Sequence, residues 1–183
     1  MLLTEFDANR QAIINPEALH EPLEGFPKIA VSCFSRLTFQ RMLEMFPHEL
    51  IYEISMANVA IPIYKLVIDD NELAIFNAPV GASACVGILE DIFALGADKL
   101  VLFGTCGVLD EDIKETSIII PSHALRDEGT SFHYVEASDE IAVNVGVLDH
   151  FRSYLNERQI SHKEGKVWTT DGIYRETNGK LKA

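Results

Sequence analysis

The chain has 183 residues, of which 48% are hydrophobic and 23% charged, and its net charge at pH 7 is −13. This length and composition predict a globular domain with a substantial core. The negative charge argues against nucleic acid and anionic membranes as partners, because both would repel the chain, but it allows a small anionic ligand held by local donors.

The cysteine pattern and the N-terminus both favour a cytoplasmic protein. Cys33, Cys85 and Cys106 form no CxxC pair and have no metal-ligand spacing. An odd number of such cysteines is typical of free thiols in a reducing compartment. The N-terminus lacks the basic and apolar regions of a signal peptide, and no apolar run is long enough to span a bilayer. We therefore expect a cytoplasmic location and no metal site.

The first half of the chain predicts an irregular arm followed by a helix and several strands. Residues 1–27 contain three prolines and read as an N-terminal arm. Residues 28–34 predict a strand, and residues 36–46 predict a helix that Pro47 ends. Three extended stretches follow at 49–56, 61–69 and 72–79. The polar cluster at 69–71 predicts a hairpin turn between the last two stretches.

Residues 81–107 give the clearest secondary-structure prediction in the sequence, a helix followed by a strand. Val86, Leu89 and Ile92 recur at helical spacing, and Gly96 stands where a helix C-cap glycine is expected. A strand at 99–103 follows after a few residues, so a right-handed crossover into parallel pairing is predicted. That strand ends in the sequence GTCG. Its glycines allow a sharp turn or a close approach to a ligand, although an ordinary exit from a strand would look the same.

The second half predicts a strand at 117–121, an amphipathic helix at 139–159 with Ser138 as N-cap, and a strand at 165–171. The polar tail from residue 174 lacks a closing apolar element, so it is either loose or incomplete. The whole pattern predicts an α/β fold: a single domain over residues 28–183, with a mixed central sheet flanked by helices.

Four sets of loops at predicted strand ends carry the polar residues that binding requires: 32–36, 80–84, 104–107, and the pair 126–134 with 167–177. Arg36 could hold an oxyanion through two bonds, although a surface ion pair is the commoner role. Gly81 and Ser83 precede a helix whose free N–H groups favour an anion. For Ser83, capping alone is the commoner explanation.

The later loops pack polar and aromatic residues together around single glycines. Arg126 begins the first of them, and His133 in the same loop could shuttle a proton near neutral pH or simply make a structural hydrogen bond. Trp168, Ile173 and Tyr174, beside Asp171, could form a stacking wall for a flat heterocycle, or could equally belong to the core. The residues alone leave both pairs of alternatives open.

The segment APVGASACVGILEDIFALGADKLVLFGTCGVL, residues 78–109, resembles the nucleoside phosphorylase family, which includes hexameric-type purine nucleoside phosphorylase and uridine phosphorylase. A glycine-containing turn, a helix ending in ALGA and a strand ending in G-[ST]-x-G occur in the same order in that family. RDEGTSFHY and VWTTDGIYRET are similar to later loops of uridine phosphorylase-like members. The resemblance covers about residues 28 to 177.

The resemblance implies phosphorolysis: inorganic phosphate as co-substrate cleaves a purine or pyrimidine nucleoside to free base and ribose 1-phosphate, without another cofactor. It also implies a homo-oligomer, a dimer or a hexamer. The residues implied to bind phosphate and ribose are Arg36, Gly81, Gly104 and Thr105. Those implied to line the base are Cys106, Gly107, Ile173 and Tyr174, and a second tier comprises Ser83, Arg126, His133 and Asp171. No catalytic residue is assigned.

Three departures from the family pattern leave other functions open. The family has an arginine where Leu102 stands, and no arginine occurs from Met42 to Leu125, where a neighbouring subunit's phosphate ligand is expected. The chain stops at Ala183, before the family's ribose-binding glutamates. We therefore keep two alternatives to phosphorolysis: a non-catalytic or truncated relative that binds a nucleoside or an anion, and a phosphate-independent nucleoside hydrolase.

Overall fold

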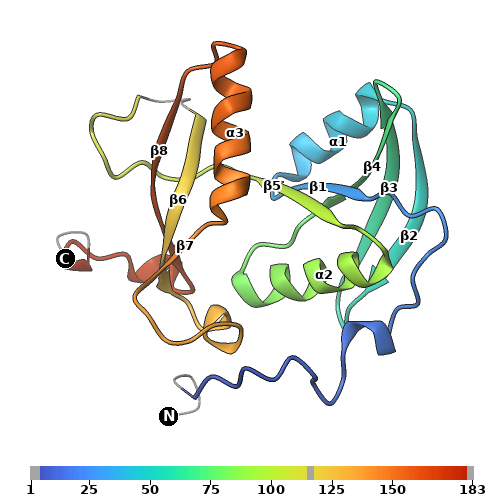
Figure 1. Ribbon diagram of the computed structural model, residues 1–183, viewed down its shortest axis with the longest axis horizontal. Helices are drawn as coiled ribbons and strands as arrows, with labels where there is room; N and C mark the ends of the chain where they lie inside the picture. The colour runs from blue at the N-terminus through green and yellow to red at the C-terminus, as the bar shows by residue number, and fades with distance from the viewer. Residues whose placement is uncertain (1–4, 115–117, 181–183) are drawn as a thin grey trace. The chain divides into compact units, whose positions relative to one another are not determined.

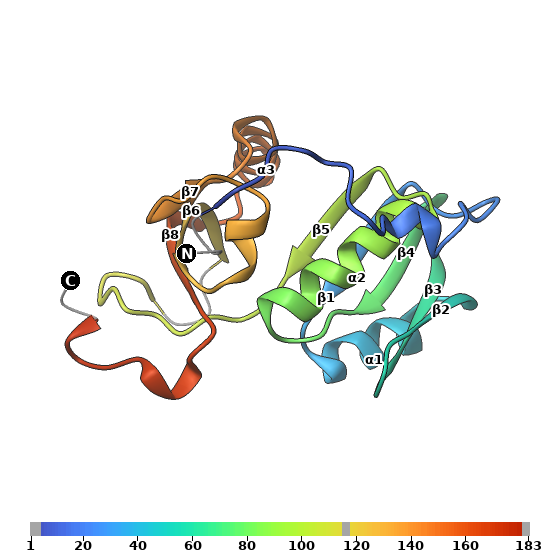
Figure 2. The ribbon, with the colours of Figure 1, turned by 90° about the horizontal axis from the view of Figure 1, so that it is seen from below.

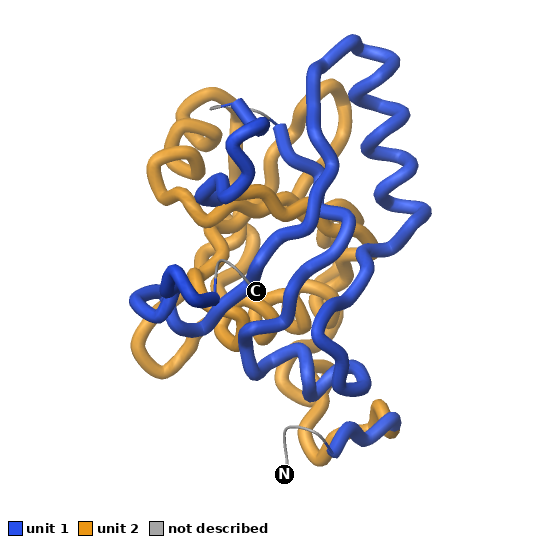
Figure 3. The backbone as a smooth tube through the Cα atoms, turned by 90° about the vertical axis from the view of Figure 1, so that its left-hand side faces the viewer, with its two compact units in different colours: residues 1–8, 106–183 blue, residues 9–105 orange. Residues whose placement is uncertain are grey.

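A computed structural model describes residues 5–114 and 118–180. The chain divides into two compact units, residues 9–105 and residues 1–8 with 106–183 (Figure 3). Each unit has its own sheet.

The unit of residues 9–105 is built on a mixed sheet. Within the described residues its strands run in the order β2-β3-β4-β1-β5. β2, β3 and β4 pair antiparallel, whereas β1 lies between β4 and β5 and is parallel to both. The strands are β1 (Ile29–Cys33), β2 (His48–Ser55), β3 (Ala60–Ile68), β4 (Asn71–Asn77) and β5 (Lys99–Phe103). The predicted α/β fold with a mixed sheet is confirmed.

Local sequence explains the turns of this sheet. Asp69 and Asp70 have positive φ angles of 47° and 62° between β3 and β4, which is the backbone that a tight hairpin turn requires. The predicted hairpin is therefore confirmed. The crossover from β4 to β5 is parallel as predicted, but β1 is inserted between the two strands.

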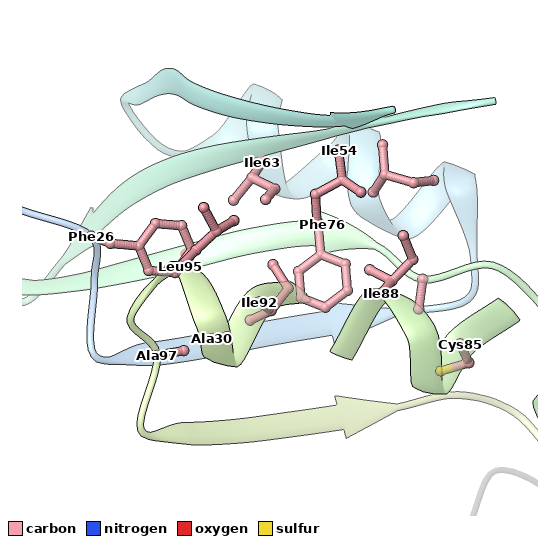
Figure 4. Packing of buried hydrophobic residues seen from close by; sticks show 13 residues of the cluster. Phe26, Ala30, Ile54, Ile63, Phe76, Cys85, Ile88, Ile92, Leu95 and Ala97 are labelled. Carbon is pink, nitrogen blue, oxygen red and sulfur yellow. The ribbon is translucent and has the colours of Figure 1, made fainter. Parts of the chain in front are cut away.

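Two helices cover opposite faces of the sheet, as Figures 1 and 2 show: α1 (Arg36–Met45) and α2 (Ala82–Leu95). Because side chains alternate along a strand, Phe76 of β4 belongs to the core under α2, whereas Ile75 belongs to the core under α1. Figure 4 shows the Phe76 ring beside Ile88 and Ile92 of α2. Gly96 ends α2 with φ 130°, as expected for a C-cap glycine.

The segment before β1 is irregular apart from a short 3-10 helix at Pro16–Ala18. Its end is nevertheless part of the fold, because Leu23 N donates to Leu95 O at 3.0 Å and Phe26 is buried in the core under α2. His20 contacts α2 and β2: its Nε2 lies 3.2 Å from Asp91 Oδ1, and its Nδ1 lies 3.2 Å from Tyr52 Oη.

The unit of residues 1–8 and 106–183 carries a smaller sheet. Among its described residues, the strand order is β7-β6-β8, with β6 parallel to β8 and antiparallel to β7. The elements are β6 (Ile118–Asp127), β7 (Glu140–Ala142), α3 (Val145–Glu157) and β8 (His162–Thr170), with 3-10 turns at Thr130–His133 and Ile173–Arg175. Ser117, the first residue of one predicted strand, lies outside the described residues.

The predicted helix at 139–159 is wrong in its first turns. Glu140–Ala142 form strand β7, which pairs with His123–Leu125 of β6, and the helix starts only at Val145. Its N-cap is Asn144, whose Oδ1 accepts from Val147 N at 3.2 Å. Ser138 is therefore not the cap. Pairing with β6 overrides the helical spacing of Ile141, which local sequence alone does not reveal.

None of the helices in the described ranges is long and apolar enough to cross a membrane.

Candidate functional site

The carboxyl ends of three parallel strands meet at one edge of the sheet in the unit of residues 9–105. Cys33 pairs with Asn77 of β4 and with Phe103 of β5, so β1, β4 and β5 end level with one another. The loops that follow them, with the first turns of α1 and α2, hold five predicted site residues: Arg36, Gly81, Ser83, Gly104 and Thr105. Such an edge is where open α/β sheets bind ligands.

The loop after β1 leads directly into helix α1. Ser35 is the N-cap, and its Oγ accepts from Thr38 N at 3.1 Å. Arg36 is the first residue of the helix and is exposed. Among the described residues no acidic side chain forms an ion pair with Arg36. The surface ion pair considered from sequence is therefore absent within the described part of the chain.

The loop after β4 leads into helix α2. Gly81 is the N-cap with φ 112°, a conformation that side-chain-bearing residues rarely adopt. No side chain caps this helix, and Ser83 in its first turn is exposed. Its first amides therefore have no capping side chain, which is the arrangement that favours an anion at a helix N-terminus.

The loop after β5 approaches the loop after β1. A Cβ on Gly104 would lie 2.9 Å from Cδ2 of Phe34, so the phenyl ring rests against the glycine backbone. Thr105 follows and is exposed. Gly107 has no positive φ and open space where a Cβ would be, so neither a turn nor a close approach within the chain requires glycine there.

A buried serine, which the sequence reasoning missed, joins the ends of β1 and β4. Ser32 is 0% exposed; its Oγ donates to Phe76 O at 2.8 Å and accepts from Ala78 N at 3.1 Å. The signal in the sequence was a serine within an apolar strand. A buried hydroxyl needs hydrogen-bond partners, so this serine indicates a hydrogen bond to a neighbouring strand.

The buried cysteines of this unit are not poised as nucleophiles. Burial raises the pKa of the Cys33 thiol and of the Cys85 thiol. Both are therefore protonated at neutral pH, whereas the thiolate is the reactive form. Cys106 is exposed and belongs to the other unit.

Arg126 organises the loop of residues 128–139 in the second unit. The side chain is only 8% exposed, and all three guanidinium nitrogens donate to this loop. The acceptors are Ser131 Oγ, Ser138 Oγ and the carbonyl oxygens of Val135, Glu136 and Ser138. The guanidinium also lies 4.0 Å from the centre of the Phe132 ring. These contacts give Arg126 a structural role.

The loops that follow β6 and β8 hold four further predicted residues: His133, Asp171, Ile173 and Tyr174. Asp171 Oδ2 accepts from Gly129 N at 3.0 Å, which connects the two loops. His133 ends the 3-10 turn and is exposed. Ile173 and Tyr174 are 71% and 94% exposed, so they do not belong to the core of their unit.

A second feature missed from sequence is a charged cluster beside these loops. Asp127 Oδ2 accepts from Trp168 Nε1 at 3.2 Å and from Lys180 Nζ at 2.7 Å. Over residues 5–114 and 118–180, no group of three or more His, Cys, Asp and Glu side chains is arranged to hold a metal ion.

Residues 28–183 match the family model described as the phosphorylase superfamily. The chain belongs to this superfamily. The resemblance stated from residues 78–109 and the later loops is thereby confirmed.

A guanosine phosphorylase of Halorubrum lacusprofundi is 22% identical over 63% of this chain and 49% of its own length. A uridine phosphorylase structure from Vibrio fischeri has a TM-score of 0.75 at 19% identity and covers 93% of this chain and 70% of its own. A Helicobacter pylori 5′-methylthioadenosine/S-adenosylhomocysteine nucleosidase, solved with butyl-thio-DADMe-Immucillin-A, has a TM-score of 0.67 at 19% identity over 87% and 70% of the two chains.

These structural likenesses establish the fold. This chain spans about half or less of the length of the curated relatives it matches.

Proposed function

We propose that this superfamily member carries the phosphate and ribose part of a nucleoside phosphorylase site. The observation that carries the proposal is the level ending of β1, β4 and β5, which gathers Arg36, the N-terminus of α2 and Thr105 at one edge. A guanidinium, free helix amides and a hydroxyl are the donors that an inorganic phosphate ion requires.

Each group has a role that follows from its chemistry. Arg36 binds phosphate through its guanidinium, and the amides that follow Gly81 add donors without adding charge. Thr105 donates its hydroxyl to phosphate or ribose, and Gly104 brings this backbone close to the ligand. The family resemblance also implies that Cys106, Gly107, Ile173 and Tyr174 line the base.

The reaction exchanges one bond at the anomeric carbon of the ribose for another. The C1′–N bond to the base breaks, a phosphate oxygen forms the new C1′–O bond, and the departing base keeps the electron pair and later takes a proton from water. Positive charge develops on the ribose in the transition state. A phosphate held beneath the ribose stabilises this charge, so positioning and electrostatics supply the catalysis.

Hydrolysis is an alternative function, and the absence of arginine from Met42 to Leu125 favours it over phosphorolysis. Each charged hydrogen bond to phosphate is worth about 1.5–3 kcal/mol, so Leu102 removes one strong ligand that the family pattern supplies. Water as the attacking group needs no such ligand. The other alternative, which ranks before hydrolysis, is a non-catalytic relative that binds a nucleoside or an anion.

Release of free base from a panel of nucleosides, measured by chromatography with and without phosphate, separates the three. Release that depends on phosphate supports phosphorolysis, and equal release without phosphate identifies a hydrolase. Calorimetric binding of a nucleoside without release identifies a non-catalytic relative. If the folded chain neither binds a nucleoside nor releases a base, the proposal is wrong.

We also propose that the protein forms a homo-oligomer, a dimer or a hexamer, because the family resemblance implies one. Sedimentation at micromolar concentration tests this, and a monomer would contradict it.

A further inference from the structure

The unit of residues 106–183 has an open hollow that the proposed phosphorolysis does not use. Its volume is about 730 Å³, and its lining includes Leu125, Phe132 and Trp168. Leu125 of β6 pairs with Trp168 of β8, so the two side chains come from neighbouring strands. Asp127, two residues further along β6, adds a carboxylate to the lining. The hollow thus combines apolar, aromatic and acidic groups.

A primary ammonium group already lies in this hollow. Lys180 Nζ is 2.7 Å from Asp127 Oδ2 and 5.7 Å from the centre of the Trp168 ring. Trp168 Nε1 donates to the same carboxylate oxygen at 3.2 Å. The hydrogen bond from Lys180 is the main cause that lowers the pKa of Asp127. The carboxylate is therefore ionised at neutral pH and acts only as an acceptor.

The remaining charges of the hollow also favour a cation over an anion. Arg126 is the other basic residue of the described lining, and its nitrogens already donate to loop acceptors. Asp139 is a further acidic residue of the lining. The chain as a whole carries a net charge of −13, which raises the local concentration of cations.

We propose that this hollow binds primary amines that carry a flat apolar group, and that Lys180 is its internal occupant. The side chains of Lys180 and Asp127 are 44% and 39% exposed, and ion pairs as exposed as this are weak. A ligand amine therefore displaces Nζ at little cost. Its ammonium bonds Asp127 beside the Trp168 ring, which adds cation–π stabilisation. Its apolar group packs against Trp168 and Phe132, which adds hydrophobic stabilisation.

Intrinsic fluorescence tests the proposal directly, because Trp168 is the only tryptophan in the chain. The probe is 2-phenylethylamine, and its neutral counterpart 2-phenylethanol serves as the matched ligand control. We expect a saturable change in emission with the amine and none with the alcohol. Lys180→Met removes the internal occupant and should tighten binding of the amine several-fold, whereas Asp127→Asn should weaken it about fivefold or more.

Asp149→Asn is the matched protein control, because this exposed carboxylate lies on α3 and is not part of the hollow's lining. Its affinity for the amine should equal that of the wild type, and circular dichroism should show that all three variants are folded. Equal responses to amine and alcohol would overturn the proposal. The proposal is also wrong if Asp127→Asn binds the amine as tightly as the wild type does. It is wrong as well if the amine causes no saturable change in emission in either the wild type or Lys180→Met. Release of nucleobase plays no part in these readouts, so phosphorolysis stands or fails separately.

Discussion

The ring of Phe34 rests against the backbone of Gly104, with Cδ2 only 2.9 Å from where a Cβ would be. This contact joins the loop after β1 to the loop after β5, immediately before Thr105. Glycine is required there by the neighbouring ring and not by its own backbone, because its φ is not positive. The two loops are therefore coupled through one pair of residues.

Gly104→Ala should force Phe34 to move and should lower the free energy of unfolding by about 1 kcal/mol. The cost stays moderate because the ring is partly exposed and can shift. In a Phe34→Ala background the same change should cost clearly less, since the clash is gone. Urea unfolding of the four proteins measures this coupling. Strict additivity of the two changes would show that the contact does not constrain the loops.

Thr105→Ala should weaken binding of phosphate or nucleoside and leave stability within about 0.5 kcal/mol of the wild type, because Thr105 is exposed. Titration calorimetry measures the affinity and thermal unfolding measures the stability. Thr105→Ser keeps the hydroxyl and should retain most of the affinity. If alanine binds as tightly as threonine, Thr105 is not a ligand-binding residue.

Arg36→Ala should weaken phosphate binding more than nucleoside binding, by a factor of ten or more that corresponds to one lost charged hydrogen bond of about 1.5–3 kcal/mol. Arg41→Ala is the matched control, since Arg41 is also exposed on α1 but stands more than one turn further along the helix. Calorimetry with phosphate and with nucleoside alone separates the two ligands. Equal losses for both would assign Arg36 to the fold.

The sequence predicted the unit of residues 9–105 well because its signals are local. Asp69 and Asp70 specify their turn, and Gly96 specifies the end of α2. In contrast, β7 forms by antiparallel pairing with β6, in which Ala142 pairs with His123 and Glu140 pairs with Leu125. The helical spacing of Ile141 cannot reveal this pairing. Sequence also left the role of Arg126 open, because its acceptors are mostly carbonyl oxygens of the following loop. Asp127 and Lys180 are 53 residues apart, beyond any local pattern.

Arg126→Ala should destabilise the second unit by about 1–3 kcal/mol, because it removes a buried guanidinium and the hydrogen bonds that it donates to several partly buried acceptors. Arg126→Lys should recover only part of the loss, since one ammonium cannot replace the planar fork. Hydrogen exchange should show the loss of protection in residues 128–139. Protection equal to that of the wild type in Arg126→Ala would mean that the loop is held without this side chain.

Glu164 and Arg152 form a two-bond pair between β8 and α3, with Nε–Oε1 at 2.6 Å and Nη2–Oε2 at 2.9 Å. The hydrogen bonds from Arg152 lower the pKa of Glu164 in the folded protein. A carboxylate whose folded pKa lies below its unfolded value stabilises the protein above the unfolded pKa. That stabilisation is lost as the pH falls through the folded pKa.

Glu164→Gln should therefore be less stable than the wild type at pH 7, and the difference should shrink as the pH falls from the unfolded pKa of Glu164 through its lower folded pKa. The pair is exposed, so the difference at pH 7 is small and should shrink further in high salt. Glu157→Gln, a change of an exposed carboxylate at the end of α3, controls for net charge. Thermal unfolding at a series of pH values from about 8 down to about 3, which spans the ordinary pKa of glutamate, measures the stability of both variants and the wild type. If the stability difference between Glu164→Gln and the wild type stays unchanged at the lowest pH, the glutamine acts through packing and not through the lost charge.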